Sequence, residues 1–212
     1  MAFVEPAVPE EPVAPAFTYA SRGALKMEAA LRHFGLDVSD RVCADLGCSN
    51  GGFTDVLLRR GAARVHAVDT AYGQLDYRLR SDPRVAVHER SNALHLDPPE
   101  LCGVVVIDIG WTKQALAVPA ALRWLSDDAA ARVVSLVKPH YESGRHSLTV
   151  DEADAVTVGV LDAMPALGVA VEGCIRCPIR GGKGKNIEHL ALLRASGVAT
   201  DVTDGADGGR SR

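Results

Sequence analysis

The sequence contains no apolar run that approaches the ~18 residues needed for a membrane-spanning helix. Its first residues also lack the basic stretch and the apolar stretch that together make a secretory signal. No internal repeat is visible either. We therefore expect neither a membrane span nor a membrane partner.

The sequence also lacks the paired cysteine motifs of a zinc site. Cys174 and Cys177 have the spacing of half such a site, but no second pair exists. On an extended strand their thiols would point to opposite faces. We therefore predict no metal site. The total of five cysteines, an odd number, fits a reducing cytosol and predicts a cytoplasmic protein.

A basic excess is absent as well. The chain has 23 Lys and Arg against 27 Asp and Glu, a formal net charge of −4. The acidic excess lies in the two end segments, and the segment between them has no net charge. This balance excludes a large positive electrostatic field that would attract nucleic acid non-specifically. Any contact with nucleic acid must therefore come from a local basic patch.

Both ends of the chain have the composition of segments without a packed core. Proline recurs at every third position from Pro6 to Pro15, which predicts a disordered or polyproline-type leader over residues 1–17. Residues 195–212 are rich in Gly, Asp, Ser and Thr and predict a disordered tail. Since 47% of the sequence is apolar, residues 18–194 can bury the core of a single domain.

Within residues 18–194, helical and extended patterns alternate. Short apolar runs predict strands over residues 41–46, 64–68, 85–89, 103–107, 132–137, 169–174 and 186–193. Amphipathic patterns predict helices over residues 21–34, with Ser21 as the cap, and over 53–60, 74–79, 114–125 and 151–164. This alternation indicates a Rossmann-like α/β domain, with a doubly wound and mostly parallel sheet.

Polar residues follow the predicted strands at the edge where open parallel sheets bind ligands. Asp69, Asn92, Asp108 and Lys138 each follow a strand, and Glu188 opens the last one. If that last strand is antiparallel, Glu188 lies at the same edge as the others. Lysines and carboxylates are mostly solvated surface groups, but Asp108 and Lys138 directly follow apolar runs, which is unusual for such groups.

A glycine-rich loop opens at this edge, with the sequence Asp45-Leu-Gly-Cys-Ser-Asn-Gly-Gly-Phe-Thr54. Glycines let backbone amides approach a ligand at a helix N-terminus, although an ordinary strand–helix turn has similar composition. The spacing is not the G-x-G-x-x-G of nicotinamide enzymes. With Asp69 placed to bind a ribose diol, the loop predicts a nucleotide-type cofactor. The expected cofactor contacts are Asp45, Gly47, Ser49, Asn50, Gly51, Gly52, Phe53, Thr54, Asp69, Asn92 and Asp108.

These motifs occur in an order that resembles the FtsJ-like methyltransferases, and in particular the TlyA group, described both as haemolysins and as ribosomal RNA 2′-O-methyltransferases. The resemblance covers nearly all of residues 18–194. It rests on the blocks Ser21-Arg-Gly-Ala-Leu-Lys26, the glycine loop, Arg60-Gly-Ala-Ala-Arg-Val-His-Ala-Val-Asp69, Tyr72-Gly-Gln-Leu75, Asp82-Pro-Arg-Val85, Val106-Ile-Asp108, Leu136-Val-Lys-Pro139 and Pro178-Ile-Arg-Gly181.

The resemblance implies a seven-stranded fold that uses S-adenosylmethionine, and a Lys-Asp-Lys-Glu catalytic tetrad. The four roles map onto Lys26, Asp108, Lys138 and Glu188. The lysine matching Lys138 takes the proton from a ribose 2′-hydroxyl. A free lysine is charged at neutral pH, so a second ammonium nearby must favour loss of that proton, while carboxylates hold the geometry. The implied partner is structured RNA, ribosomal in the TlyA group.

The sequence departs from the family pattern at several points. The N-terminal S4-type RNA-binding domain of the TlyA group is not recognisable, and we expect the chain to lack it. The segment Ile109-Gly-Trp-Thr-Lys113 differs from the usual Val-Ser-Phe-Ile-Ser, and the loop before Glu188 is one residue longer than expected. These differences put the identity of the substrate in doubt.

Residues beside the expected acceptor edge are candidates for RNA contacts. His140, Tyr141 and Trp111 would line the acceptor mouth, although packing in the core is an equally good interpretation of Trp111. Tyr141 could stack on a nucleobase. A basic stretch from Arg176 to Lys185 could contact phosphates. The expected RNA contacts are Arg22, Tyr141, Arg180, Lys183 and Lys185.

Several functions therefore stand as alternatives. The leading hypothesis is a 2′-O-ribose methyltransferase acting on structured RNA. Another hydroxyl acceptor is the second, and a cofactor-binding scaffold without catalysis is the third, which the intact tetrad disfavours. A pore-forming haemolysin lacks support from any transmembrane or cationic amphipathic segment. The loop spacing disfavours a nicotinamide-dependent oxidoreductase.

Overall fold

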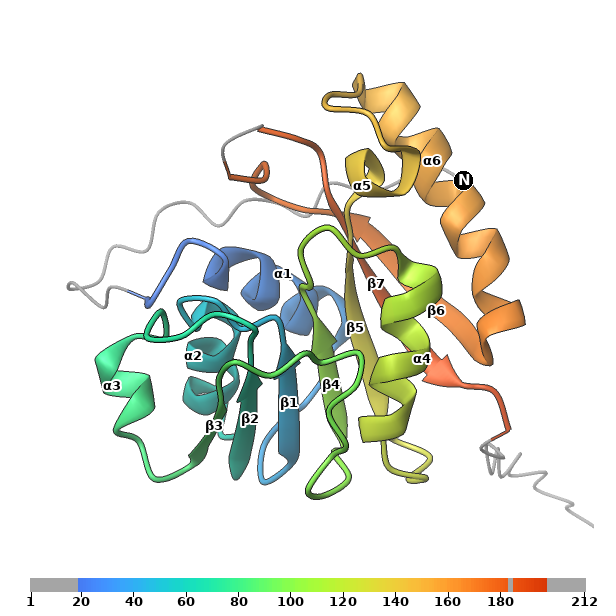
Figure 1. Ribbon diagram of the computed structural model, residues 1–212. Helices are drawn as coiled ribbons and strands as arrows, with labels where there is room; N and C mark the ends of the chain where they lie inside the picture. Colours follow the sequence, from blue (N-terminus) through green and yellow to red (C-terminus); the bar gives the residue numbers. More distant parts are fainter. Residues whose placement is uncertain (1–18, 183–184, 198–212) are drawn as a thin grey trace, which may run out of the picture.

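The computed structural model describes residues 19–182 and 185–197. These residues form one seven-stranded sheet with the strand order β3-β2-β1-β4-β5-β7-β6 (Figure 1). The predicted α/β class with a mostly parallel sheet is confirmed. The expected leader and most of the expected tail lie outside the described residues, although β7 continues through Ala195.

Six of the strands run in one direction and β7 runs against them. Strands β1, β2, β3, β4 and β5 pair in parallel, whereas β7 is antiparallel to both β5 and β6. The start of β7 therefore lies at the carboxyl edge of the parallel strands. The strands are β1 Val42–Leu46, β2 Arg64–Val68, β3 Val85–His88, β4 Val104–Ile107, β5 Arg132–Val137, β6 Val169–Arg176 and β7 His189–Ala195.

Helices cover both faces of the sheet, so the central strands are buried on both sides (Figure 1). Along β4, Val104 and Val106 join the core on the α1 and α2 side, while Val105 and Ile107 join the core on the α4 and α6 side. This explains why the strand reads as a continuous apolar run. The helices are α1 Ala24–Phe34, α2 Gly52–Arg59, α3 Tyr77–Arg80, α4 Gln114–Trp124, α5 Pro139–Ser143 and α6 Val150–Ala163, with a 3₁₀ turn at Met164–Leu167.

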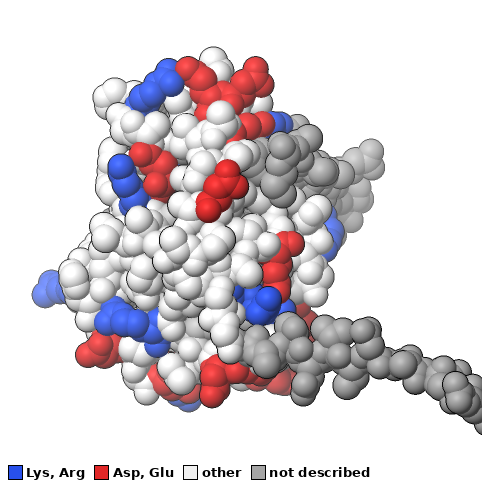
Figure 2. Space-filling model, turned by 90° about the vertical axis from the view of Figure 1, so that its right-hand side faces the viewer, with Lys and Arg blue, Asp and Glu red and all other residues white. Residues whose placement is uncertain are grey.

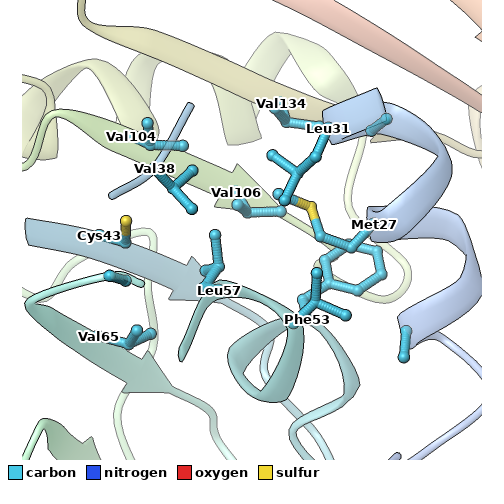
Figure 3. Close-up of a cluster of buried hydrophobic side chains, with 14 of the residues drawn as sticks. Met27, Leu31, Val38, Cys43, Phe53, Leu57, Val65, Val104, Val106 and Val134 are labelled. Carbon is cyan, nitrogen blue, oxygen red and sulfur yellow. The ribbon is translucent and has the colours of Figure 1, made fainter. Parts of the chain in front are cut away.

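The core beside α1 fixes the position of the helix that carries Lys26. Met27 and Leu31 of α1 pack against Phe53 and Leu57 of α2 and against the valines of β4 and β5 (Figure 3). Met27 and Leu57 are fully buried. Burying a side chain of this size stabilises the fold by about 1.5–3 kcal/mol. Lys26, the neighbour of Met27, is thereby held against the sheet edge.

Several element boundaries differ from the predicted ones. Helix α1 begins at Ala24, and Ser21 makes no capping bond, because residues 21–23 form a separate turn in which the Ala24 amide donates to the Ser21 carbonyl. Helix α3 begins later than predicted, where the Asp76 side chain caps it. Helix α5 was not predicted. The last strand begins at His189, so Glu188 directly precedes it.

The face of the molecule beside α6 and β6 carries mixed charge (Figure 2). In Figure 2, which shows the side of α6 and β6, acidic and basic side chains lie in small groups around a largely uncharged area. This agrees with the neutral composition of residues 21–194. Among the described residues, no helix is both long and apolar enough to cross a membrane.

Candidate active site

Two lysine–carboxylate pairs lie together at the carboxyl edge of the sheet. The Lys26 Nζ lies 2.5 Å from the Glu188 Oε2. The Lys138 Nζ forms an ion pair with the Asp108 Oδ1. All four side chains line one cavity, although they come from α1, the ends of β4 and β5, and the start of β7. The structure thus brings together the four residues that the sequence analysis grouped.

Lys26 and Glu188 form the more deeply buried pair. Their side chains are 10% and 6% exposed, against 13% and 27% for Lys138 and Asp108. Burial alone would lower the pKa of Lys26, but the carboxylates of Glu188 and Asp108 raise it above the ordinary value. Lys26 is therefore a permanent positive charge at neutral pH.

The backbone around Glu188 is tightly fitted to the loop that precedes it. The Cys177 amide donates to the Glu188 carbonyl over 2.8 Å. A Cβ atom at Gly181 would lie 2.4 Å from the Glu188 Oε1 and 2.9 Å from its Cδ. Only glycine at position 181 leaves room for the carboxylate in this position.

The glycine loop between β1 and α2 is shaped by close backbone approaches. Gly47 has a φ of +95°, and a Cβ at this position would lie 2.5 Å from the Asp108 carbonyl oxygen. Gly51 also has a positive φ, of +92°. The loop can therefore pass directly beside the end of β4, and it brings Asp108 next to the cavity that the loop borders.

Three of the expected cofactor contacts lie in the interior beneath the loop. Asp45 and Thr54 are fully buried, and Phe53 belongs to the core. The Asp45 Oδ2 accepts from the Thr54 amide over 3.0 Å and from its hydroxyl over 2.7 Å. Burial, opposed by these bonds, raises the pKa of Asp45 to about 7. These residues hold the start of α2 and do not line the adjacent cavity.

The other residues expected to contact the cofactor lie either on the wall of a cavity or in the glycine loop outside it. A cavity of ≈ 590 Å³ is lined by five of them, namely Gly47, Ser49, Asp69, Asn92 and Asp108. Asn50, Gly51 and Gly52 lie in the loop outside this lining. The Asp69 carboxylate is oriented by the Ser49 amide and the Ala71 amide, each at 2.8 Å. It remains partly exposed at the wall.

A second cavity of ≈ 660 Å³ adjoins the first and contains the two ion pairs. Three residues line both cavities, namely Asp108, Trp111 and Lys138. Trp111 is 86% exposed, so the core-packing interpretation of this residue is wrong. Its ring stacks on Tyr141 with centroids 4.8 Å apart, and the Lys138 Nζ lies 5.5 Å from the Tyr141 centroid.

The predicted basic stretch is only partly available for contacts. Arg176 forms an ion pair of 2.6 Å with Asp154 of α6, so its side chain lies against that helix. Arg180 and Lys185 are exposed near the second cavity. Arg22 is exposed as well and donates to the Arg180 carbonyl over 3.0 Å, which places the two arginines side by side. Lys183 lies outside the described residues.

Both cavities also contain residues that the sequence analysis did not single out. Gln74 and Ser91 line the first cavity, and Arg145, His146 and Asn186 line the second. They lie in loops that follow strands or, for Arg145 and His146, helix α5, so no periodic pattern marks them. Among the described residues, no group of three or more His, Cys, Asp or Glu side chains could hold a metal ion.

Comparison with known proteins identifies relatives of the whole folded unit. The model of the FtsJ-like methyltransferase family matches residues 19–192. The 16S/23S rRNA (cytidine-2′-O)-methyltransferase TlyA of Mycobacterium tuberculosis is 41% identical over 188 residues, which cover 83% of this chain and 68% of that protein. Hemolysin A of Brachyspira hyodysenteriae is 34% identical and covers 82% of this chain and 75% of that protein.

Solved structures show the same fold. A candidate hemolysin from Lactococcus lactis superposes with a TM-score of 0.77 at 34% identity, covering 84% of this chain and 89% of that one. A second, from Streptococcus thermophilus, has a TM-score of 0.74 at 36% identity, covering 87% of this chain and 70% of that one. With the family model matching nearly all of the described residues, the chain belongs to the FtsJ-like methyltransferase family.

Proposed function

We propose that this protein is an S-adenosylmethionine-dependent 2′-O-ribose methyltransferase acting on structured RNA, and on ribosomal RNA in particular. One observation carries the proposal: two cavities meet at the Lys138–Asp108 pair, which belongs to the wall of both. A donor in one cavity and an acceptor in the other would meet at a group able to take a proton. The names of the TlyA relatives support RNA as the acceptor.

The first cavity has features that fit S-adenosylmethionine. The partly exposed carboxylate of Asp69 is held by two backbone amides, and it can accept hydrogen bonds from the two hydroxyls of a ribose. Ser49 and Asn92 line the wall beside it. Structural neighbours with little sequence identity bind S-adenosylhomocysteine in the same fold. When bound, the cofactor supplies an electrophilic methyl group.

Lys138 is the proposed proton acceptor for the ribose hydroxyl. The amine must be neutral to take the proton, and the deprotonated hydroxyl oxygen would then be the acceptor for the methyl group that bound S-adenosylmethionine would supply. Glu188 keeps Lys26 charged, and Asp108 orients Lys138.

The second cavity offers contacts suited to a nucleotide. The ring of Tyr141 lies close to Lys138, and the exposed ring of Trp111 stacks on it. An unpaired base beside the reacting ribose could stack on these rings. Arg22, Arg180 and Lys185 could contact phosphates at the rim. Because these cations are few, we propose that shape and not a broad positive surface selects the RNA.

The decisive experiment measures methyl transfer from labelled S-adenosylmethionine to folded ribosomal RNA fragments, followed by mapping of the methylated atom by mass spectrometry. Lys138→Ala and Lys138→Arg should abolish transfer, since arginine cannot be deprotonated in proteins. Cofactor affinity, measured by calorimetry, should stay nearly unchanged. Lys113→Arg, an exposed lysine outside both cavities, is the matched control and should remain active.

Three outcomes would contradict the proposal. Methylation of a base instead of a ribose oxygen would exclude the reaction. Near-normal turnover of Lys138→Arg would exclude the role of Lys138. Equal activity on unstructured oligonucleotides and folded RNA would exclude selection by shape.

A further inference from the structure

A buried histidine directly follows the carboxylate that pairs with Lys26. His189 is the first residue of β7 and is fully buried. Its Nε2 lies 2.9 Å from the Asp154 Oδ1, and its Nδ1 lies 2.9 Å from the Thr157 Oγ1. Both partners lie on α6, and Thr157 is fully buried too. The imidazole therefore ties the start of β7 to a helix.

We propose that His189 is a positioning residue, which sets the places of Glu188 and Lys138 through its two bonds to α6. The inference rests on the proposed function, because it assigns a role within that reaction. His189 itself does not line either cavity. It acts through its neighbours in the chain and in the sheet.

The register of the sheet links His189 to both lysine–carboxylate pairs. His189 is paired with Val137, the residue before Lys138, across the β5–β7 ladder. On its other side it is paired with Arg176 at the end of β6. Glu188 precedes it in the chain. A shift of the His189 backbone would therefore displace Glu188 directly and the end of β5 through the ladder.

The chemistry of the contacts determines the direction of the hydrogen bond between His189 and Asp154. A carboxylate only accepts, so the Nε2 of His189 donates to Asp154. Burial lowers the pKa of His189, against the opposing effect of the Asp154 carboxylate, and Arg176 lowers it further. The Thr157 Oγ1, which donates to the Ala153 carbonyl over 2.9 Å, is the partner of Nδ1. The two nitrogens thus have different partners and fix the ring in one orientation.

Asp154 extends this arrangement to the neighbouring strand. Its other carboxylate oxygen, Oδ2, pairs with the Arg176 Nη2 at 2.6 Å. One acidic residue of α6 therefore holds the end of β6 and the start of β7 together. Because the glycine-containing loop that faces Glu188 leaves from the end of β6, the same contacts hold both sides of the carboxylate.

The test compares substitutions of His189 with a matched change at the far end of the same strand. His189→Leu keeps the size of the side chain but removes both hydrogen bonds, and Leu193→Val is the control for lost stability at a fully buried position of β7. We expect kcat to fall at least tenfold in His189→Leu, with KM for RNA and cofactor affinity within twofold of the wild type. Leu193→Val should keep its kcat.

Rescue by a conservative variant separates positioning from simple packing. In His189→Gln the amide nitrogen reaches the position of Nε2 and can donate to Asp154. This variant should recover most of the lost kcat. If His189→Leu does not fold, Thr157→Val replaces it, since this change removes only the hydroxyl, and it should lower kcat several-fold.

Hydrogen exchange gives a readout that does not depend on substrate. The amides of residues 186–190 should exchange faster in His189→Leu than in Leu193→Val at matched stability. A kcat within twofold of the wild type in His189→Leu, no rescue by glutamine, or equal exchange in both variants would overturn the inference. If the wild type itself fails to methylate RNA, the proposed function fails, and the exchange comparison still tests the positioning role.

Discussion

Because Lys26 and Glu188 form a buried ion pair, we expect substitutions of these two residues to have large and non-additive effects on stability. In Lys26→Met, the Glu188 carboxylate stays 94% buried without its partner, since its side chain is only 6% exposed. Removing one partner of a buried ion pair typically costs about 3–5 kcal/mol, because the remaining charge has lost its compensation. We therefore expect Lys26→Met to lower the free energy of unfolding by about 3–5 kcal/mol.

The double variant Lys26→Met/Glu188→Met should lose much less than the sum of the single changes. Replacing a whole buried pair by apolar side chains is often close to neutral, so the coupling energy should reach about 2 kcal/mol. The measurement is equilibrium unfolding in urea at constant pH, with the denaturant slope checked for each variant.

An exposed pair provides the control. Arg78 and Asp76 lie 2.9 Å apart, but their side chains are 58% and 25% exposed. Arg78→Met should cost less than about 1 kcal/mol, as exposed pairs do. If Lys26→Met costs no more than Arg78→Met, or if the changes at Lys26 and Glu188 add without coupling, the two side chains do not act as a buried charge pair.

Four further predictions follow from the site. Asp45 has a pKa raised to about 7 by burial, so its contribution to stability is present below pH ~4 and is lost as the pH rises to 7. Urea unfolding from pH 4 to 8 should therefore show Asp45→Asn gaining roughly 4 kcal/mol relative to the wild type, whereas a pH-independent difference would contradict the assignment. Asp69→Ala should weaken S-adenosylmethionine binding by about 1–3 kcal/mol in calorimetry, and unchanged affinity would exclude its role. Gly181→Ala should fold yet lose most methyl transfer, because the added Cβ displaces the Glu188 carboxylate, and full activity would show that the loop can yield. Arg180→Ala/Lys185→Ala should raise the KM for RNA and flatten its salt dependence, with cofactor affinity as the control.

The sequence predicted which side chains lie at the carboxyl edge of the sheet, because strand ends are marked by a change of residue type. Asp108 and Lys138 each follow an apolar run, and such runs become buried strands. Glu188 was harder to place, since nothing local in the sequence specifies the direction of a strand. The antiparallel pairing of β7 comes from tertiary contacts. From the sequence, the position of Glu188 can therefore be predicted only on the condition that the last strand is antiparallel.

Residues whose place depends on loop conformation could not be predicted. Trp111 looked equally suited to the core, but a backbone with a φ of +58° turns it out to the surface. Arg145 and His146 reach the second cavity from a loop after α5 that has no periodic pattern. Ser21 has the residue type of a helix cap, but a tight turn before α1 takes its place. Local propensity does not report these long-range constraints.

The order of strands in the sheet has a consequence for how the chain acquires its fold. Strand β7 is the last in sequence but lies between β5 and β6, so the sheet cannot close until residues up to Ala195 have left the ribosome. Until then β5 and β6 present unpaired edges, which favour wrong pairing and aggregation. The Lys26–Glu188 contact spans 162 positions, so it forms among the last. Nascent and truncated chains that end before β7 should thus lack the Lys26–Glu188 pair, and formation of this pair reports completed folding.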